Sequence, residues 1–331
     1  MEAPEPPRRH EVAAEWVFDD EASRVRSLAA MRQFDVAVFQ HEFGIYPGLD
    51  GEDVVGFMRE SPIPIVVVLH TVLSEPSQHQ WRVLERVMAL AETVVVPTRA
   101  ARARLLSVHD VAPDHVQVIP HGAVPNVGPA SSRRPEPTIL TWGLIGPGKG
   151  LEYGIESLAS LSDLAPMPTY VIAGETHPKV FAREGEGYRD RLKKQAADLG
   201  VADQVVFEDC YLDSASLRGL ARASDIILLP YESRQQICSG VLVEAISAGK
   251  PVVATAFPHA IELLASAAGI VVPHEDPEAI ADAIRRLCTD DALAASMRTE
   301  ATLVAERLAW PAVGREYLKL FHQVLDEGRA A

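Results

Sequence analysis

A glycine-rich octapeptide, GLIGPGKG at residues 143–150, is the first stretch of the sequence that could bind a phosphate group. It matches seven positions of the P-loop pattern G-x-x-x-x-G-K-[ST], but Gly150 stands where that pattern needs a hydroxyl for Mg²⁺. This disfavours a Mg²⁺-dependent ATPase. Residues 151–161 predict a helix directly after the loop, and helix N-termini attract anions. The octapeptide alone supports a phosphate-binding loop and a tight turn with a solvated lysine equally.

A second stretch, SGVLVEAISAGKPVVAT at residues 239–255, adds the chemistry that a nucleotide needs. Ser239 and Gly240 open a predicted helix whose N-terminus can hold a diphosphate, and Glu244 lies about one turn further in. A carboxylate at that place can accept hydrogen bonds from the vicinal hydroxyls of a ribose. Glu244 alone would be interpreted as a solvated or capping residue. Together, the two stretches predict a nucleotide-binding site.

Composition limits the remaining function classes. A net charge of −15, spread along 331 residues, argues against binding to nucleic acid. The three cysteines have no metal-type spacing, and no aspartate pair suggests a metal site, because Asp19 and Asp20 are typical of a charged helix start. No apolar run reaches the length of about 20 residues that spans a bilayer, and the first residues lack a signal region. We expect a cytoplasmic protein, with a membrane-peripheral position left open.

Short runs rich in valine and isoleucine alternate with helical patterns along most of the chain. Such runs predict the buried strands of parallel sheets, so the predicted fold class is α/β. The predicted strands are residues 35–40, 63–70, 93–98, 116–121, 138–143, 169–174, 204–209, 225–230, 251–255 and 269–273.

A segment rich in proline, glycine and serine interrupts this alternation at residues 124–137, as a connection between domains does. We therefore expect an N-terminal domain at residues 1–128, a linker at 129–137 and a C-terminal domain at 138–306. Residues 307–331 are expected to form a helix that packs back toward the N-terminal domain.

These stretches together resemble the family 4 retaining glycosyltransferases. GPGKG is similar to the K-G loop of that family, IPHGA at 119–123 to its I-P-N-G segment, and residues 239–255 to the second half of its E-x7-E motif. The run at 276–287 and the segment around Trp310 also match, so the resemblance covers most of residues 35–325. It implies the GT-B architecture, in which two Rossmann-like domains with parallel sheets face a central cleft.

The resemblance implies roles for individual residues. Lys149 would bind the donor diphosphate, Glu244 the ribose, and His70 would lie beside the transferred sugar, although a histidine at a strand end is otherwise more often structural. The implied donor-binding residues are Gly146, Gly148, Lys149, Gly150, Gln236, Ser239, Gly240 and Glu244. The candidates for the acceptor side are His41, Glu42 and Gly44, in the segment HEFGIYPGLDG, although His41 and Glu42 can equally stabilise a loop.

Three positions depart from the family pattern. Leu144 stands where many members have an arginine next to the lysine, and Gln236 occupies the first position of E-x7-E. Phe257, Pro258 and His259 replace the more usual glycines before a glutamate. These changes suggest a distinct subfamily.

The implied activity is retaining transfer of a sugar from a nucleoside-diphosphate sugar, without a cofactor or metal, because lysine and helix N-termini neutralise the leaving diphosphate. The acceptor would be a sugar, a lipid or a small molecule. Two alternatives remain: a nucleotide-sugar epimerase of the same architecture, and a non-catalytic or partner-dependent nucleotide-sugar-binding subunit. A partner subunit and a homo-oligomer both stay open.

The N-terminal domain is predicted to be short. Residues 1–34 contain prolines, charges and a helical pattern, whereas a family 4 enzyme opens with an apolar strand and a glycine-rich loop. We expect that about one strand unit is missing, and that the chain binds a nucleotide sugar but transfers it poorly alone.

Overall fold

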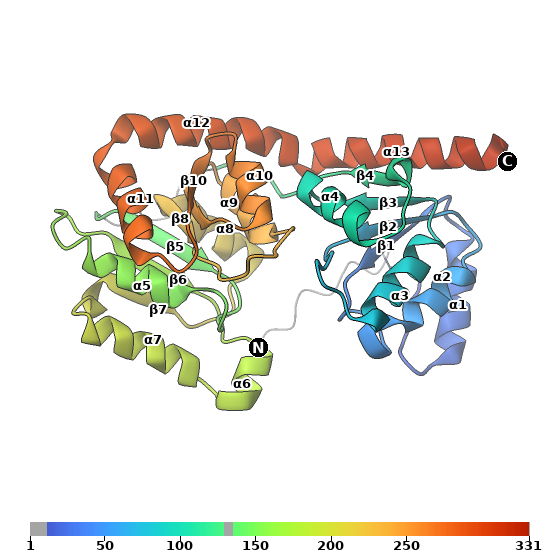
Figure 1. The fold of residues 1–331 in the computed structure, drawn as a ribbon, viewed down its shortest axis with the longest axis horizontal. Coiled ribbons are helices and arrows are strands. Elements are labelled where there is room, and N and C mark those ends of the chain that lie inside the picture. The colour runs from blue at the N-terminus through green and yellow to red at the C-terminus, as the bar shows by residue number, and fades with distance from the viewer. Residues whose placement is uncertain (1–11, 129–134, 331) are drawn as a thin grey trace. The chain divides into compact units, whose positions relative to one another are not determined.

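A computed structural model describes residues 12–128 and 135–330 (Figure 1). The chain forms two compact units: unit 1 consists of Met1–Pro120 and Val313–Ala331, and unit 2 of His121–Ala312. The domain limits expected from the sequence lie at residues 128 and 307, and most of the expected linker lies outside the described residues. Unit 1 thus combines segments from both halves of the sequence.

Unit 1 is built on a four-stranded parallel sheet with the strand order β1-β2-β3-β4. Its strands are β1 (Ala37–His41), β2 (Ile65–Leu69), β3 (Thr93–Val96) and β4 (Val116–Val118). Its helices are α1 (Glu21–Met31), α2 (Asp53–Arg59), α3 (Gln78–Met88), α4 (Arg99–Val108) and most of α13 (Trp310–Ala330), with short 3-10 turns at Leu49–Gly51 and Pro113–His115. All five residues of β2 are buried, as expected for a central strand covered on both faces.

Local sequence signals place the ends of these helices. A capping box joins Ser77 and Gln80 at the start of α3, and the Thr98 side chain caps α4. Near the C-terminus, Val313 and Leu320 of α13 pack into one buried cluster with Val66 of the sheet. The C-terminal helix therefore completes a core that begins about 250 residues earlier.

Unit 2 contains a six-stranded parallel sheet with the order β10-β9-β8-β5-β6-β7. Its strands are β5 (Thr138–Trp142), β6 (Thr169–Ala173), β7 (Val205–Glu208), β8 (Ile226–Leu229), β9 (Val252–Thr255) and β10 (Gly269–Val272). Its helices are α5 (Leu151–Ala159), α6 (Pro178–Glu184), α7 (Gly187–Asp198), α8 (Ser214–Ala223), α9 (Gly240–Ser247), α10 (Pro258–Leu264), α11 (Pro277–Thr289) and α12 (Asp291–Leu308), with a 3-10 turn at Ala202–Gln204.

Helices cover both faces of this sheet (Figure 1). One buried cluster joins the sheet to α5, α7 and α11, and the other joins it to α8, α9, α10 and α12. The chain moves from β5 outward to β6 and β7, and then returns to place β8 on the other side of β5. The strand order therefore reverses between β5 and β8.

The predicted strands are all present, with limits within three residues of those expected, so the α/β fold class is confirmed. Between Val12 and Ala37 the described residues contain α1 and no strand. The expected shortening of the N-terminal domain stays a prediction.

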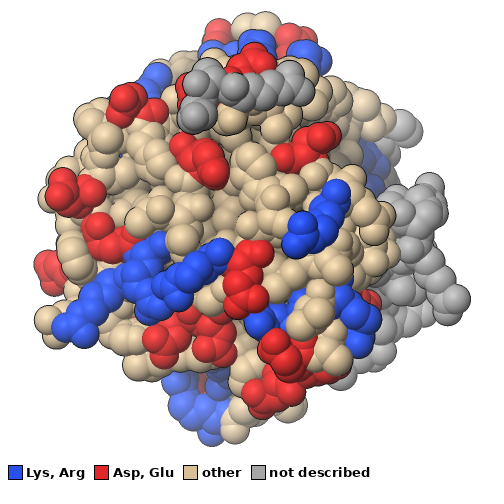
Figure 2. All heavy atoms as spheres, turned by 90° about the vertical axis from the view of Figure 1, so that its right-hand side faces the viewer, with Lys and Arg blue, Asp and Glu red and all other residues tan. Residues whose placement is uncertain are grey.

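The surface carries charges of both signs. Figure 2 shows a face on which lysine and arginine side chains are interspersed with aspartate and glutamate. Within residues 12–128 and 135–330, no helix combines the length and the apolar character that crossing a membrane requires.

Candidate nucleotide-binding site

The carboxyl ends of β5 and β8 hold the two stretches that the sequence singled out. The loop at residues 143–150 leaves β5, and the loop at residues 230–239 leaves β8, its neighbour in the sheet. Because the strand order reverses here, the two connections lead to helices on opposite faces of the sheet, and ligands of such sheets bind at this kind of position. The N–H group of Glu232 donates a hydrogen bond of 3.1 Å to the carbonyl oxygen of Gly148, which ties the two loops together.

Backbone geometry explains why glycine occupies the last position of the octapeptide. Gly150 has φ 64° and caps α5, and a Cβ atom built on it would lie 1.9 Å from the carbonyl oxygen of Pro230. A serine or threonine at this place would be strained and would clash with the β8 loop. Close contact between two loops, and not phosphate chemistry, excludes the hydroxyl of a P-loop.

Lys149 is a half-buried cation without an anionic partner in the described chain. Its Nζ atom lies 4.6 Å from the centroid of the Tyr231 ring, and it makes no ion pair or hydrogen bond to the side chains described here. Burial lowers the pKa of the Lys149 ammonium. A desolvated cation beside a helix N-terminus has the chemistry that suits an anion, and this role of Lys149 stays a prediction.

The N-terminus of α9 is fixed by the side chain of its own N-cap residue and by a side chain from the start of α10. The Ser239 hydroxyl accepts a hydrogen bond from the N–H of Leu242, and the N–H of Ser239 itself donates to Nδ1 of His259 at 2.8 Å. Burial lowers the pKa of His259 to about 4, so the ring is neutral near pH 7 and its Nδ1 can accept. His259, one of the three departures from the family pattern, therefore holds the start of α9.

Glu244 lines a pocket of about 280 Å³ within unit 2. Arg218 of α8 contributes to the same pocket, together with the indole rings of Trp142 and Trp310. The exposed Glu244 carboxylate forms no ion pair with the described residues, and the Arg218 guanidinium interacts electrostatically with the carboxylate of Asp213. The pocket thus combines aromatic walls with charged groups that are available to a ligand.

The remaining donor-side candidates lie in the same two loops. Gly240 begins α9, and the side-chain amide of Gln236 donates to the carbonyl oxygen of Cys238 at 3.1 Å. A Cβ atom on Gly146 would lie 3.2 Å from Val180, whereas nothing lies within 4 Å of one on Gly148. The structure brings these candidates together at one edge of the sheet, while their roles in binding stay predictions.

His70 lies at the carboxyl end of β2, in unit 1. Its N–H donates to the carbonyl oxygen of His41 at 3.0 Å, and its Nε2 lies 2.7 Å from Oε1 of Gln40. The Glu42 carboxylate accepts a hydrogen bond of 2.6 Å from the hydroxyl of Thr71. The candidates of unit 1 therefore cluster at the carboxyl edge of its own sheet.

His41 is almost fully buried, with an exposed fraction of 1%. Neither ring nitrogen has a hydrogen-bond partner in the described chain, its ring meets Phe43 edge-on at 5.3 Å, and burial lowers its pKa to about 4. Contact with an acceptor would require this ring to become accessible. Gly44 is exposed. The acceptor-side role of His41, Glu42 and Gly44 stays a prediction.

Several residues of the site did not stand out in the sequence. Tyr231, Arg218 and Trp142 have no motif of their own, although Tyr231 directly follows a strand and a proline. An aromatic residue at a strand end is too common to point to a site. Only the fold shows that it meets a lysine 82 positions earlier.

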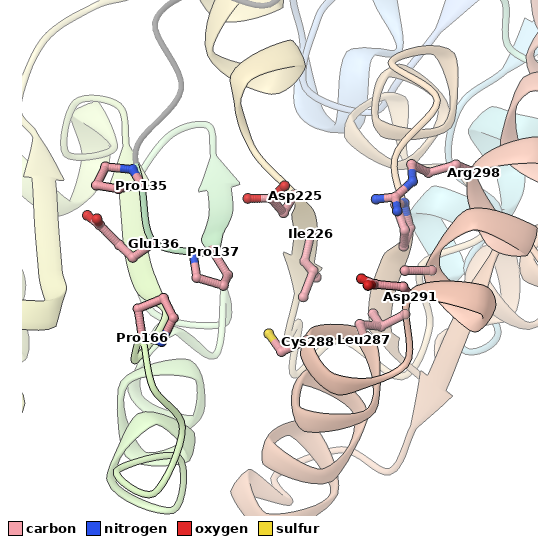
Figure 3. A pocket seen from close by; sticks show the side chains of 12 residues that line it. Pro135, Glu136, Pro137, Pro166, Asp225, Ile226, Leu287, Cys288, Asp291 and Arg298 are labelled. Atoms are coloured by element: carbon pink, nitrogen blue, oxygen red, sulfur yellow. The ribbon is translucent and has the colours of Figure 1, made fainter.

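A second pocket lies at the amino edge of the same sheet (Figure 3). It measures about 320 Å³, and Figure 3 shows prolines and acidic side chains around it, with Arg298 at one side. The Asp225 carboxylate accepts the N–H of Thr138 at 2.9 Å. Burial and the nearby Asp225 raise the pKa of the Cys288 thiol to about 11, so the thiol is protonated and unreactive at neutral pH.

No group of three or more histidine, cysteine, aspartate or glutamate side chains in residues 12–128 and 135–330 is arranged to hold a metal ion.

Comparison with known protein families shows which family the chain belongs to. Residues 129–304 match the family described as glycosyl transferases group 1, and residues 3–126 match glycosyltransferase family 4. The chain belongs to the glycosyl transferases group 1 family. The resemblance to family 4 glycosyltransferases, predicted from the motifs, is confirmed.

Curated relatives are inositol phosphate glycosyltransferases. The D-inositol 3-phosphate glycosyltransferase of Corynebacterium kroppenstedtii is 27% identical over 270 residues, which cover 76% of this chain and 58% of that protein. The enzyme of the same name from Corynebacterium glutamicum is 25% identical over 293 residues, which cover 80% of this chain and 67% of that protein. The chain thus spans less than two thirds of the first relative's length.

Solved structures share the fold of this glycosyltransferase family member. The Anabaena protein HepE in complex with UDP superposes with a TM-score of 0.75 at 18% identity, over 91% of this chain and 82% of that chain. Both units have the Rossmann-like parallel sheet, so the GT-B fold class is confirmed.

Proposed function

We propose that this protein is a retaining glycosyltransferase that takes a sugar from a nucleoside-diphosphate sugar. The observation that carries the proposal is Lys149, a half-buried cation with no anionic partner in the described chain, at the point where the strand order of unit 2 reverses. Membership of the glycosyl transferases group 1 family supports the reaction class.

In this proposal the donor diphosphate binds Lys149 and the N-terminus of α9. The N–H groups at the start of α9 and the helix dipole favour a doubly negative group, and Ser239 and His259 hold that end in place. The ribose hydroxyls bind the Glu244 carboxylate, and the base enters the adjoining pocket of about 280 Å³.

The proposed chemistry breaks the bond between the anomeric carbon and the diphosphate oxygen. The acceptor oxygen forms the new bond on the same face of the sugar, and its proton passes to the departing diphosphate. Lys149 and the α9 N-terminus stabilise the negative charge that develops on this leaving group, and the proposal requires no metal. His70 is proposed to contact the transferred sugar.

Titration calorimetry with UDP, GDP and ADP sugars tests the donor site. We expect at least one to bind, with the affinity reduced in Lys149→Ala, and matched transfer assays should include D-inositol 3-phosphate, which the names of the relatives suggest as an acceptor. Binding of none of these donors would overturn the proposal. A changed sugar without any acceptor would identify an epimerase instead, and binding without turnover would identify a non-catalytic subunit.

A further inference from the structure

Tyr231 is buried, and hydrogen bonds and a ring contact fix its position. It follows β8, is 2% exposed, and its carbonyl oxygen accepts two hydrogen bonds, from the Thr255 hydroxyl at 2.6 Å and from Nδ1 of His274 at 2.8 Å. Its ring stacks on Phe257 with centroids 5.4 Å apart and planes at 26°. Thr255 ends β9 and His274 follows β10, so three neighbouring strands fix the position of this ring.

The ring of Tyr231 is the described partner of the Lys149 ammonium. Nζ lies 4.6 Å from the ring centroid, well within the range of about 6 Å in which a cation is attracted to an aromatic face. Such an attraction gains strength when the cation is desolvated, and Lys149 is half-buried. Lys149 is also the only cationic residue in the loop at 143–150, so its position decides where that loop presents positive charge.

The hydroxyl of Tyr231 does not account for this arrangement. It is buried beside Ser239, but the two groups do not reach hydrogen-bond geometry, and it has no other partner among the described residues. The ring therefore carries the interaction with Lys149. Phe257, which departs from the family's glycines, supports that ring from the next loop.

We propose that Tyr231 is a positioning residue that holds the Lys149 ammonium ready for the donor diphosphate. A flexible lysine on a glycine-rich loop would lose side-chain freedom when it bound the ligand, and an aromatic ring that holds it in advance reduces that cost. The inference rests on the proposed function for its ligand, but the contact between the two side chains can be tested without any ligand.

The first test uses the nucleotide-free protein. Reductive methylation of lysines with ¹³C-formaldehyde keeps the positive charge and gives one NMR signal for each dimethyl-lysine, and the signal absent from Lys149→Arg is that of Lys149. We expect the ring current of Tyr231 to shift this signal upfield in the wild type and in Tyr231→Phe, and the shift to disappear in Tyr231→Leu. A Lys149 signal at the ordinary position in the wild type would overturn the proposal, even if Tyr231→Leu fails to fold.

The second test measures the affinity for UDP and GDP by calorimetry. Tyr231→Phe keeps the ring and should stay within about two-fold of the wild type, whereas Tyr231→Leu should bind about ten-fold more weakly. In a Lys149→Met background, Tyr231→Leu should cause no further loss, because its effect passes through the lysine. Equal losses in Tyr231→Phe and Tyr231→Leu, or independent losses in the double variant, would overturn the proposal. If neither nucleotide binds the wild type, the proposed function fails. The NMR signal of Lys149 still shows whether its ammonium contacts the Tyr231 ring.

Discussion

The two edges of the unit 2 sheet are both hollowed, yet they present opposite chemistry. The carboxyl edge has glycine loops, the starts of α5 and α9, and Lys149, whose ammonium lies over the Tyr231 ring. The amino edge has prolines, the end of α11 and the carboxylates of Glu136, Asp225 and Asp291 (Figure 3). We therefore expect an anionic ligand to be favoured at the first edge and disfavoured at the second.

The volume of a pocket does not by itself distinguish the candidate site from the amino edge. The pocket at the amino edge, of about 320 Å³, is slightly larger than the pocket of about 280 Å³ that Glu244 lines. What distinguishes the carboxyl edge is the reversal of the strand order, where the connections from β5 and β8 lead to opposite faces of the sheet.

The largest expected effect comes from the carboxyl edge of the other sheet, in unit 1. If His70 contacts the transferred sugar, His70→Ala should lower kcat about 100-fold or more, because interactions made only in the transition state affect turnover. The affinity for the bare nucleoside diphosphate should change little. Steady-state kinetics and calorimetry on one preparation check this, and equal losses in kcat and affinity would return His70 to a structural role.

Removing charges at the carboxyl edge of unit 2 should weaken binding directly. Lys149→Ala and Glu244→Ala should each cost about 1.5 to 3 kcal/mol, roughly ten-fold to a hundred-fold in donor affinity, because each removes one charge-assisted contact. Calorimetry measures the loss, and circular dichroism should show an unchanged fold. Unchanged affinity in both variants would move the donor site elsewhere.

Lowering the pH should reduce the free energy of unfolding, because the buried His259 at the carboxyl edge is neutral in the folded chain. The pKa of His259 is about 4 in the folded chain, because burial disfavours its charged form, and about 6.5 when unfolded. Between these values the unfolded chain binds the extra proton, so the free energy of unfolding should fall by about 1.4 kcal/mol for each pH unit below 6.5. His41 contributes in the same direction in unit 1. Urea unfolding from pH 7 to 4 should show a smaller slope in His259→Asn, and an identical slope would contradict the assignment.

The smallest expected effect is at the amino edge. Arg298→Gln and Cys288→Ser change the pocket of Figure 3 but leave the carboxyl edge intact, so the donor affinity should stay within about two-fold of the wild type. Calorimetry under the conditions used for Lys149→Ala provides the comparison. A ten-fold loss in either variant would mean that the two edges do not differ in function as proposed.

Sequence patterns predicted the elements and the motifs better than the contacts between them. Runs of buried valine and isoleucine fix each strand locally, and Lys149 and Glu244 stand in recognisable sequence motifs. The contact of Lys149 with Tyr231 depends on the neighbouring positions of β5 and β8, which no local pattern encodes. The hydrogen bond from Ser239 to His259 likewise joins the starts of two helices, α9 and α10, through the fold.

The discontinuous make-up of unit 1 has a consequence for synthesis on the ribosome. Val66 and Val95 need Val313, Leu320 and Val324 of α13 to complete their cluster, but the whole of unit 2 is translated in between. At about 5–20 residues per second, the sheet of unit 1 waits roughly 10 to 40 seconds for that helix. Unit 2 can therefore finish folding first, although it is encoded second, and the core of unit 1 is complete only when the last helix arrives.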